Sequence, residues 1–357
     1  MNFSTLLDRT LGDPLQTAQS RRAIGYLGWN VPVELILAVD AVPVQLGGLA
    51  PSGTTLAERF IESSFSAQSR AVADRWLAGD LDGLEAVIFS RSDDNAQRLY
   101  YYLCELQRLG ECKGPQPLLY DLARIRRGTS VTHTIESTRA LAAAIGVNES
   151  RLDAAIERVR ARERLLSALA ELRQRNDVPL GTAAYRIVRG ARTDWSEEFD
   201  RSMQEWLDRP ATVAPGKRVL LIGSVPSDDR VHAAIEIDGT VIVGEINAAS
   251  AMSLPTPHGG SSLQVIAQRC YEQTNAIGTL LQSPDGIVEA ARALRADGVI
   301  VWMLASDTGL AWEAPRIEHA LREASLPTLV LTSQPATLSD EVLDRIANFR
   351  RTLQEAR

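Results

Sequence analysis

The chain has 357 residues, of which 45% are hydrophobic and 23% charged, and its formal net charge is −7. This length and composition predict two or three globular domains and exclude disordered and fibrous proteins, and the acidic balance offers a phosphate backbone no broad positive field. No apolar run approaches the roughly 20 residues that span a bilayer and no secretory signal is visible, so we expect a cytoplasmic protein with no nucleic-acid and no membrane partner.

Short apolar segments alternate with amphipathic ones along most of the chain. The apolar segments are bounded by polar or turn residues and predict buried strands. They lie at 86–89, 118–120, 219–222, 241–243, 299–304 and 328–331. Helical patterns lie between them, at 94–109, 229–237, 262–272, 287–294 and 316–324. Strands that alternate with helices predict parallel sheets with crossover helices, and therefore an α/β fold.

The middle of the chain breaks this alternation. Helical periodicity runs through 135–145, 149–175 and 195–207 with no strand between them. The segment 208–216 contains two prolines and a glycine and predicts a linker. We therefore predict an N-terminal α/β lobe at 1–130, a helical middle segment at 131–212 and a C-terminal α/β lobe at 213–357, with a doubly wound parallel sheet in each lobe.

Open parallel sheets bind ligands beyond the carboxyl ends of their strands. The loops predicted there are 90–94, 223–229, 245–260 and 305–312. The first loop contains Asp93 and Asp94, which either belong to a site or cap a helix, and we expect Asp94 and Asp307 to be caps. His258 lies in the third loop and is a candidate acid or base.

The remaining histidines and cysteines form no familiar ligand set. His232 and Glu236 are four residues apart, which predicts either a ligand pair or, more commonly, a pair on a helix surface. The three cysteines, Cys104, Cys112 and Cys270, have unrelated spacings and indicate no disulfide framework. No zinc spacing, P-loop, dinucleotide fingerprint or serine elbow occurs, so we predict no metal site.

Three segments in a fixed order carry a family resemblance. Residues 25–36 (GYLGWNVPVELI) are similar to a Pro-x-Glu-Leu-Ile helix, in which Pro32 is expected as the first helical residue. Residues 93–100 (DDNAQRLY) are similar to Cys-Asp-x-x-x-Arg-Leu-Tyr, and residues 296–300 (ADGVI), followed by Ser306 and Asp307, are similar to a strand with a Cys-Asp loop. Together, over about 25–335, they resemble the 2-hydroxyacyl-CoA dehydratase and benzoyl-CoA reductase family.

The resemblance implies acyl-CoA binding, a paralogous partner subunit, an iron–sulfur cluster held by three cysteines and a separate ATP-hydrolysing activator. At the matching positions this chain has Ser66, Asp93 and Ser306. Cluster iron prefers thiolate sulfur, so the resemblance implies that this chain holds no cofactor and that the cluster belongs to a cysteine-complete partner. These three residues are then expected to line the former cluster pocket.

Three functions remain open at this point. The first is a non-redox subunit of an acyl-CoA dehydratase (lyase) or reductase complex, which shapes the acyl-CoA site beside a cysteine-complete paralogue in a heterodimer, or beside a second copy of itself. The second is a stand-alone enzyme that acts on acyl-CoA with Asp93, Ser306 or His258 as acid, base or orienting groups. The third is an acyl-CoA-binding protein without catalysis.

Overall fold

The computed structural model describes residues 2–18, 21–48, 56–174, 181–209, 216–253 and 256–355. The chain forms two compact units, and each is assembled from segments that are discontinuous in the sequence. The first unit comprises Met1–Arg164, Arg189–Ser202 and Pro255–Asn275, and the second comprises Leu165–Val188, Met203–Leu254 and Ala276–Arg357. The predicted domain boundaries at residues 130 and 212 are based on the order of elements along the chain, and they stay a prediction.

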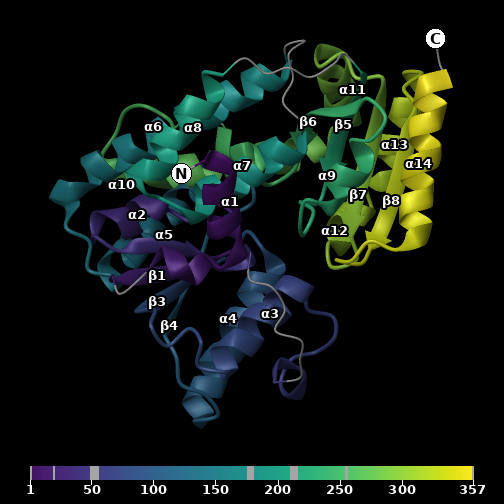
Figure 1. Cartoon of the computed structure of the whole chain (residues 1–357). Coiled ribbons are helices and arrows are strands. Elements are labelled where there is room, and N and C mark those ends of the chain that lie inside the picture. The colour runs from purple at the N-terminus through teal and green to yellow at the C-terminus, as the bar shows by residue number, and fades with distance from the viewer. Residues whose placement is uncertain are drawn as a thin grey trace. The chain divides into compact units, whose positions relative to one another are not determined.

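The first unit is built on a four-stranded parallel sheet in the order β2-β1-β3-β4 (Figure 1). The strands are β1 (Ala23–Leu27), β2 (Val42–Gln45), β3 (Ala86–Ser90) and β4 (Gln116–Tyr120). Successive side chains of a strand point to opposite faces, so Ile24 and Tyr26 pack into one core while Ala23 and Leu27 pack into another. Both faces of the sheet are therefore buried.

Helices cover each face of this first sheet. Helices α2 (Val33–Ala38) and α5 (Gly128–Ala144) contribute to one core, and α3 (Ala67–Leu77) and α4 (Asp94–Leu109) contribute to the other. Helix α1 (Phe3–Gly12) opens the unit and buries Phe3 and Leu6. A parallel sheet with helices on both faces is the doubly wound arrangement that the sequence predicts.

The second unit repeats this plan with a four-stranded parallel sheet in the order β6-β5-β7-β8. Its strands are β5 (Lys217–Gly223), β6 (Thr240–Ile246), β7 (Gly298–Leu304) and β8 (Thr328–Gln334). One face packs on α9 (Arg230–Ile235) and α14 (Asp340–Glu355), and the other packs on α11 (Pro284–Ala293) and α13 (Ala314–Glu323). The short helix α12 (Thr308–Ala311) follows β7.

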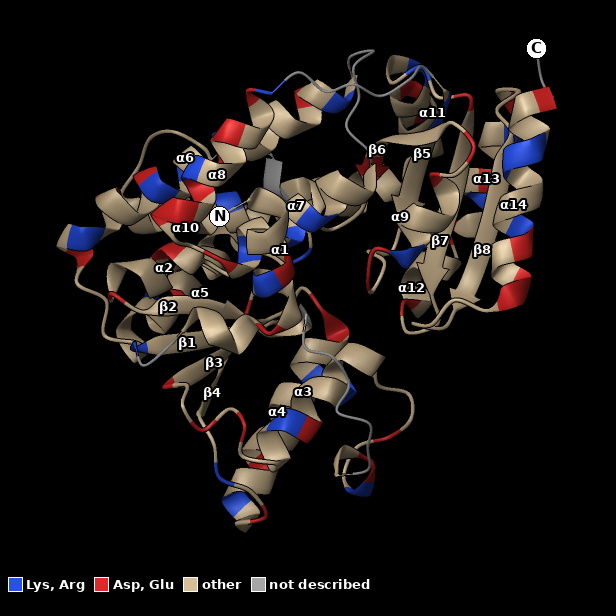
Figure 2. Cartoon of the chain, in the orientation of Figure 1, with Lys and Arg blue, Asp and Glu red and all other residues tan. Residues whose placement is uncertain are grey.

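Four helices contribute residues to both units. They are α6 (Leu152–Gln174), α7 (Gly181–Thr193), α8 (Glu197–Leu207) and α10 (Ser262–Leu281). Short 3-10 helices occupy Pro14–Thr17, Leu46–Gly48, Ala57–Arg59, Glu149–Arg151 and Ser250–Ser253. Figure 2 shows acidic and basic residues interspersed on the helices, α4 and α14 among them. Of the helices described, none combines the length and apolarity that crossing a membrane requires.

The two parallel sheets confirm the predicted fold class. Each of the six predicted strands lies within one of β3 to β8, because strands buried on both faces leave continuous apolar runs in the sequence. Helix α4 has the predicted bounds: Asp93 caps its start, and Gly110, with φ of 76°, provides the left-handed end. The predicted linker at 208–216 falls mostly outside the described residues.

Other elements differ from their predicted extent or were not predicted at all. Helix α9 is shorter than 229–237, and α10 extends beyond 272 to Leu281. Pro32 precedes α2 as its cap residue, with ψ of 81°, instead of being the first helical residue. The elements α1, β1, α3, α7 and α14 were not predicted. Helix α7 begins and ends with residues of low helix propensity, so the sequence pattern does not indicate it. It forms because Ala184, Tyr185 and Ile187 pack on one buried face, and packing overrides propensity there.

Candidate functional site

Ser66 and Asp93 lie at the N-termini of two helices that are hydrogen-bonded to each other in the first unit. Ser66 precedes α3, and its Oγ accepts a hydrogen bond from the backbone N–H of Ser69 at 3.1 Å. Asp93 precedes α4, and its Oδ1 accepts one from the N–H of Ala96 at 3.1 Å. Asn95 joins the two helix ends, because its Oδ1 accepts a hydrogen bond from the N–H of Ser66 at 2.9 Å. The structure thus brings these two predicted positions together.

The loop after β1, which contains Gly28 and Trp29, packs against the loop between β3 and α4. Gly28 has φ of 94°, and a Cβ atom there would lie 3.0 Å from the Cβ of Ser90 and 3.4 Å from that of Asp93. Ser92 fixes the same contact, because its Oγ donates a hydrogen bond to the carbonyl of Trp29 at 2.8 Å and lies 2.7 Å from the Oγ of Ser90. The carboxyl ends of β1 and β3 are therefore tied together where a sheet of this order places its ligand crevice.

The oxygen atoms at these positions do not fit an iron–sulfur cluster, which prefers thiolate ligands. The Ser66 hydroxyl and the Asp93 carboxylate are engaged as helix caps. Burial raises the pKa of the Cys104 and Cys112 thiols, and it raises the pKa of Cys270 to about 11, so these thiols are protonated near neutral pH. Within the described residues no group of three or more His, Cys, Asp or Glu side chains is placed to hold a metal ion.

Ser306 belongs to the second unit and lies half-buried in the turn after β7. The residue after it, Asp307, accepts a hydrogen bond from the Oγ of Ser224 at 3.0 Å. The same Oγ accepts one from the N–H of Leu304 at 3.0 Å. The loops after β5 and β7 are therefore joined by a hydroxyl and a carboxylate, directly beside the predicted position.

The two aspartates predicted as helix caps have other roles. Asp94 is the first residue of α4, where its charge favours the positive end of the helix, while the cap itself is Asp93. Asp307 stands at the cap position of α12 without a side-chain hydrogen bond to that helix, because its carboxylate is engaged by Ser224. The prediction for Asp94 is wrong, because the backbone places Asp93 at the cap position. Asp307 occupies its predicted cap position, but its side chain does not cap the helix.

His258 is exposed in the segment before α10 of the first unit. Its neighbour Pro257 accepts a hydrogen bond at 3.0 Å from Arg160 of α6, which anchors this segment. His258 therefore lies on the segment that precedes α10 and is hydrogen-bonded to α6. Ser66 and Asp93 instead lie together in the corner at the N-termini of α3 and α4.

The first unit also contains a buried ion pair that sequence reasoning missed. Arg269 of α10 binds Glu34 of α2 through two hydrogen bonds of 2.7 and 2.6 Å, and its third contact is with Gln273 at 3.0 Å. Burial opposes the charged guanidinium, yet neighbouring negative charge, that of Glu34 included, holds the pKa of Arg269 above its ordinary value. The available signal was a single carboxylate, Glu34, in an otherwise apolar helix.

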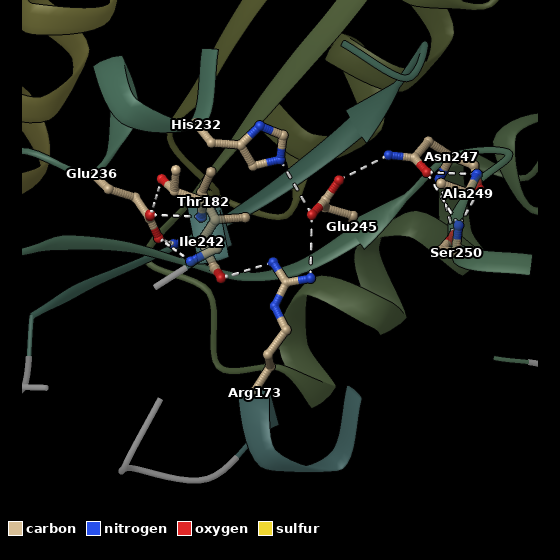
Figure 3. Close-up of polar contacts among 10 residues, drawn as sticks. Arg173, Thr182, His232, Glu236, Ile242, Glu245, Asn247, Ala249 and Ser250 are labelled. Carbon is tan, nitrogen blue, oxygen red and sulfur yellow. Dashed lines mark hydrogen bonds and ion pairs between the residues drawn. The ribbon is translucent and has the colours of Figure 1, made fainter. Parts of the chain in front are cut away.

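A second buried polar cluster lies in the second unit (Figure 3). The carboxylate of Glu245, near the end of β6, lies 3.3 Å from the Nε2 of His232 and 3.2 Å from Arg173, and it accepts a hydrogen bond from Asn247 at 3.0 Å. His232 also stacks on Tyr185, with ring centroids 4.3 Å apart. Burial would raise the pKa of Glu245, but the contacts with His232, Arg173 and Asn247 hold it at about 2, so this carboxylate is ionised.

The predicted surface pair of His232 and Glu236 is wrong. His232 is fully buried, and Glu236 follows α9 as its last cap residue. The Glu236 carboxylate accepts hydrogen bonds from the N–H groups of Gly181, Thr182 and Ile242, at 2.5, 2.9 and 3.0 Å. It thereby joins the start of α7 to β6. His232 and Glu236 therefore have separate structural roles and do not form a pair on a helix surface.

Two parallel sheets, each with helices on both faces and polar loops at the carboxyl ends of its strands, define a doubly wound α/β protein. The sequence pattern of the family described as 2-hydroxyglutaryl-CoA dehydratase, D-component, matches residues 28–352 of this chain. The chain therefore belongs to that family, which confirms the resemblance found in its three segments. No curated protein matches the chain.

Proposed function

We propose that this chain is a non-redox subunit of a 2-hydroxyacyl-CoA dehydratase or benzoyl-CoA reductase type complex. In this proposal it forms part of an acyl-CoA site beside a paralogous, cysteine-complete subunit that holds an iron–sulfur cluster. A separate ATP-dependent activator serves that cluster-bearing subunit. The family match over 28–352 supports the type of complex, and the side chains at 66 and 93 support the division of labour.

The observation that carries the proposal is the use of Ser66 and Asp93 as helix caps. Each side-chain oxygen accepts a backbone hydrogen bond, and Asn95 joins the two helix ends. If Ser66 or Asp93 bound a cluster, its side-chain oxygen would have to give up the hydrogen bond that caps its helix. In addition, a serine hydroxyl stays protonated near neutral pH and is therefore a weak ligand for cluster iron. A carboxylate and a hydroxyl in this corner are suited to orienting a polar group of a substrate, because both can form hydrogen bonds to it.

The proposal is tested by measuring iron and acid-labile sulfide in strictly anaerobic preparations. We expect essentially none in the chain produced alone, and iron together with sulfide once a cysteine-complete member of the family is co-expressed and co-purified with it. Near-stoichiometric iron in the chain alone would contradict the proposal, and so would the absence of a stable complex.

The same preparations separate the other two functions. Turnover of an acyl-CoA thioester by the chain alone, lost on Asp93→Asn, would indicate the stand-alone enzyme, because that substitution preserves the cap while removing the ionisable carboxylate. Acyl-CoA binding without product, with or without the paralogue, would indicate a binding protein. Serine at 306 offers a second variant, Ser306→Ala, for the same comparison.

A further inference from the structure

A pocket of about 470 Å³ opens in the first unit beside the carboxyl ends of β3 and β4. Its walls come from Arg91 after β3, from the loop after β4 and from the first turns of α5. Leu122 and Ile125 supply apolar surface, while Arg124 and Arg127 supply guanidinium groups. Neither the acyl-CoA corner at 66 and 93 nor the buried ion pair includes these loop residues.

The charge in this pocket is positive. Its lining includes three arginines, Arg91, Arg124 and Arg127, and among the described lining residues there is no carboxylate. Asp121 lies beside it and pairs with Arg91 at 2.5 Å and with His133 at 3.2 Å. One carboxylate against three guanidinium groups leaves a local positive surplus in a chain whose net charge is −7.

The loop that carries the arginines is held in place from two sides. Tyr271 of α10 is buried, and its hydroxyl donates a hydrogen bond to the carbonyl of Ile125 at 3.1 Å and accepts one from the N–H of Arg127 at 3.2 Å. The N–H of Asp121 donates to Ser137 of α5 at 3.1 Å. A site held in this way loses less entropy when a ligand binds.

The start of α5 adds to the attraction for an anion. This helix has 17 residues, its first turn contains no acidic side chain, and its cap residue, Arg127, makes no side-chain hydrogen bond to the helix. The N-terminus of such a helix carries a partial positive charge and favours phosphate or carboxylate groups. Arg127 therefore places a full positive charge where a cap normally places an oxygen acceptor.

From this geometry we propose that the pocket binds the phosphate groups of a nucleotide-bearing ligand. Arg91, Arg124 and Arg127 contact the phosphates, and the base lies against the apolar residue Ile125, which is 60% exposed. The identity of the ligand as CoA rests on the proposed function, in which a CoA thioester reaches the corner at Asp93. Arg91 lies two residues before Asp93 in the loop after β3, so the pocket and the corner at Asp93 share this loop.

The test is isothermal titration of the full chain, at an ionic strength of about 0.15 M, with CoA, 3′-dephospho-CoA and inorganic phosphate. The variants are Arg124→Gln and Arg127→Gln, with Arg126→Gln as the matched control, since Arg126 is an exposed arginine of the same loop that does not line the pocket. We expect each pocket variant to weaken CoA binding about tenfold, the value of one charge-assisted hydrogen bond. The control should change it by less than about twofold, because exposed charges outside contact are screened.

Each alternative outcome overturns the inference in a recognisable way. Equal losses in all three variants would mean nonspecific attraction, and undetectable CoA binding to the wild-type chain would mean that the pocket is not a nucleotide site. Inorganic phosphate that binds as tightly as CoA would reduce the pocket to a simple anion site. The iron measurement on the chain alone is independent of these results, so a failure of the pocket and a failure of the proposed function are distinguishable.

Discussion

The two sheets have the same strand order but differ in the hydrogen bonds made by the loops at the carboxyl ends of their strands. In each sheet a glycine with positive φ ends or follows the first strand: Gly28 at 94° and Gly223 at 116°. In each, a predicted site residue follows the third strand: Asp93 in the first sheet and Ser306 in the second. Because the strand order reverses between the first and third strands, both pairs of loops flank a switch point.

The difference lies in what the side chains at these two switch points bind. Asp93 caps α4, a helix of 16 residues, so its carboxylate supports local structure. Asp307, beside Ser306, binds Ser224 across the sheet and leaves the four-residue α12 without a side-chain cap. The same topology therefore carries loops with different side-chain interactions. These interactions, and not the strand order, decide which residues remain free to contact a ligand.

The buried charges differ between the units in a similar way. The first unit pairs Glu34 with Arg269, whose guanidinium stays charged at any ordinary pH. The second unit surrounds Glu245 with two partners, Arg173 and His232. Four sets of substitutions test these contrasts, from the largest expected effect to the smallest.

Arg269→Met should lower the free energy of unfolding by about 3–5 kcal/mol, because it leaves the fully buried Glu34 without its partner. Chemical denaturation of the full chain provides the measurement. The double variant with Glu34→Leu should recover most of the loss, since replacing both members of a buried pair by apolar residues is commonly neutral. A single variant as stable as the wild type would show that the pair is dispensable.

Glu245→Gln should destabilise the second unit in a pH-dependent manner. The pKa of Glu245 is about 2 in the folded chain against an ordinary 4.5, so its carboxylate stabilises the fold fully above pH 4.5, and this contribution disappears as the pH falls toward 2. That shift corresponds to roughly 3 kcal/mol at neutral pH. Denaturation of wild type and variant should differ by less at about pH 4 than at pH 7; a constant difference would contradict the assigned charge of Glu245.

Gly223→Ala should cost about 2–3 kcal/mol, because an alanine there combines a φ of 116° with a collision against the carbonyl of Trp302 in the neighbouring strand. Gly28→Ala should cost about 1 kcal/mol, because its new Cβ has no contact shorter than 3.0 Å: it would lie 3.0 Å from the Cβ of Ser90, 3.4 Å from that of Asp93 and 3.5 Å from the Ser90 carbonyl oxygen. Thermal unfolding of the two variants side by side gives the comparison. The reverse order would mean that the loop after β1 is the more rigid of the two.

Asp93→Ala should cost about 1 kcal/mol through loss of the α4 cap, while Asp93→Asn should be nearly neutral, because an asparagine oxygen caps equally well. The matched change in the second sheet, Asp307→Ala, removes one hydrogen bond from Ser224 and should cost about 1 kcal/mol without affecting a cap. Urea midpoints resolve these differences. Equal losses for alanine and asparagine at 93 would indicate that the charge, and not the cap, stabilises this corner.

Much of the fold could be predicted from the sequence, and less of the site. The predicted strands lie within the observed ones because burial on both faces demands apolar residues, and that demand is visible locally. Ser66, Asp93 and Ser306 were predicted to line one pocket. The structure places Ser66 and Asp93 on adjoining helix ends of the first unit and Ser306 in the second unit, and the actions of all three on a ligand stay a prediction. His258 was selected by its residue type and by its place in a predicted loop, and the structure shows it exposed in the segment before α10.

The sequence by itself determined the local features of this protein: the alternation of strands and helices, and helix α4 with its start and end. Only the tertiary structure decided which distant residues meet. Glu34 and Arg269 are 235 positions apart, and Arg173 and Glu245 are 72 apart. A local pattern records only whether a position favours burial. The partner of a buried charge is selected by the free energy of the whole packed arrangement, since an unpaired charge there would cost several kcal/mol.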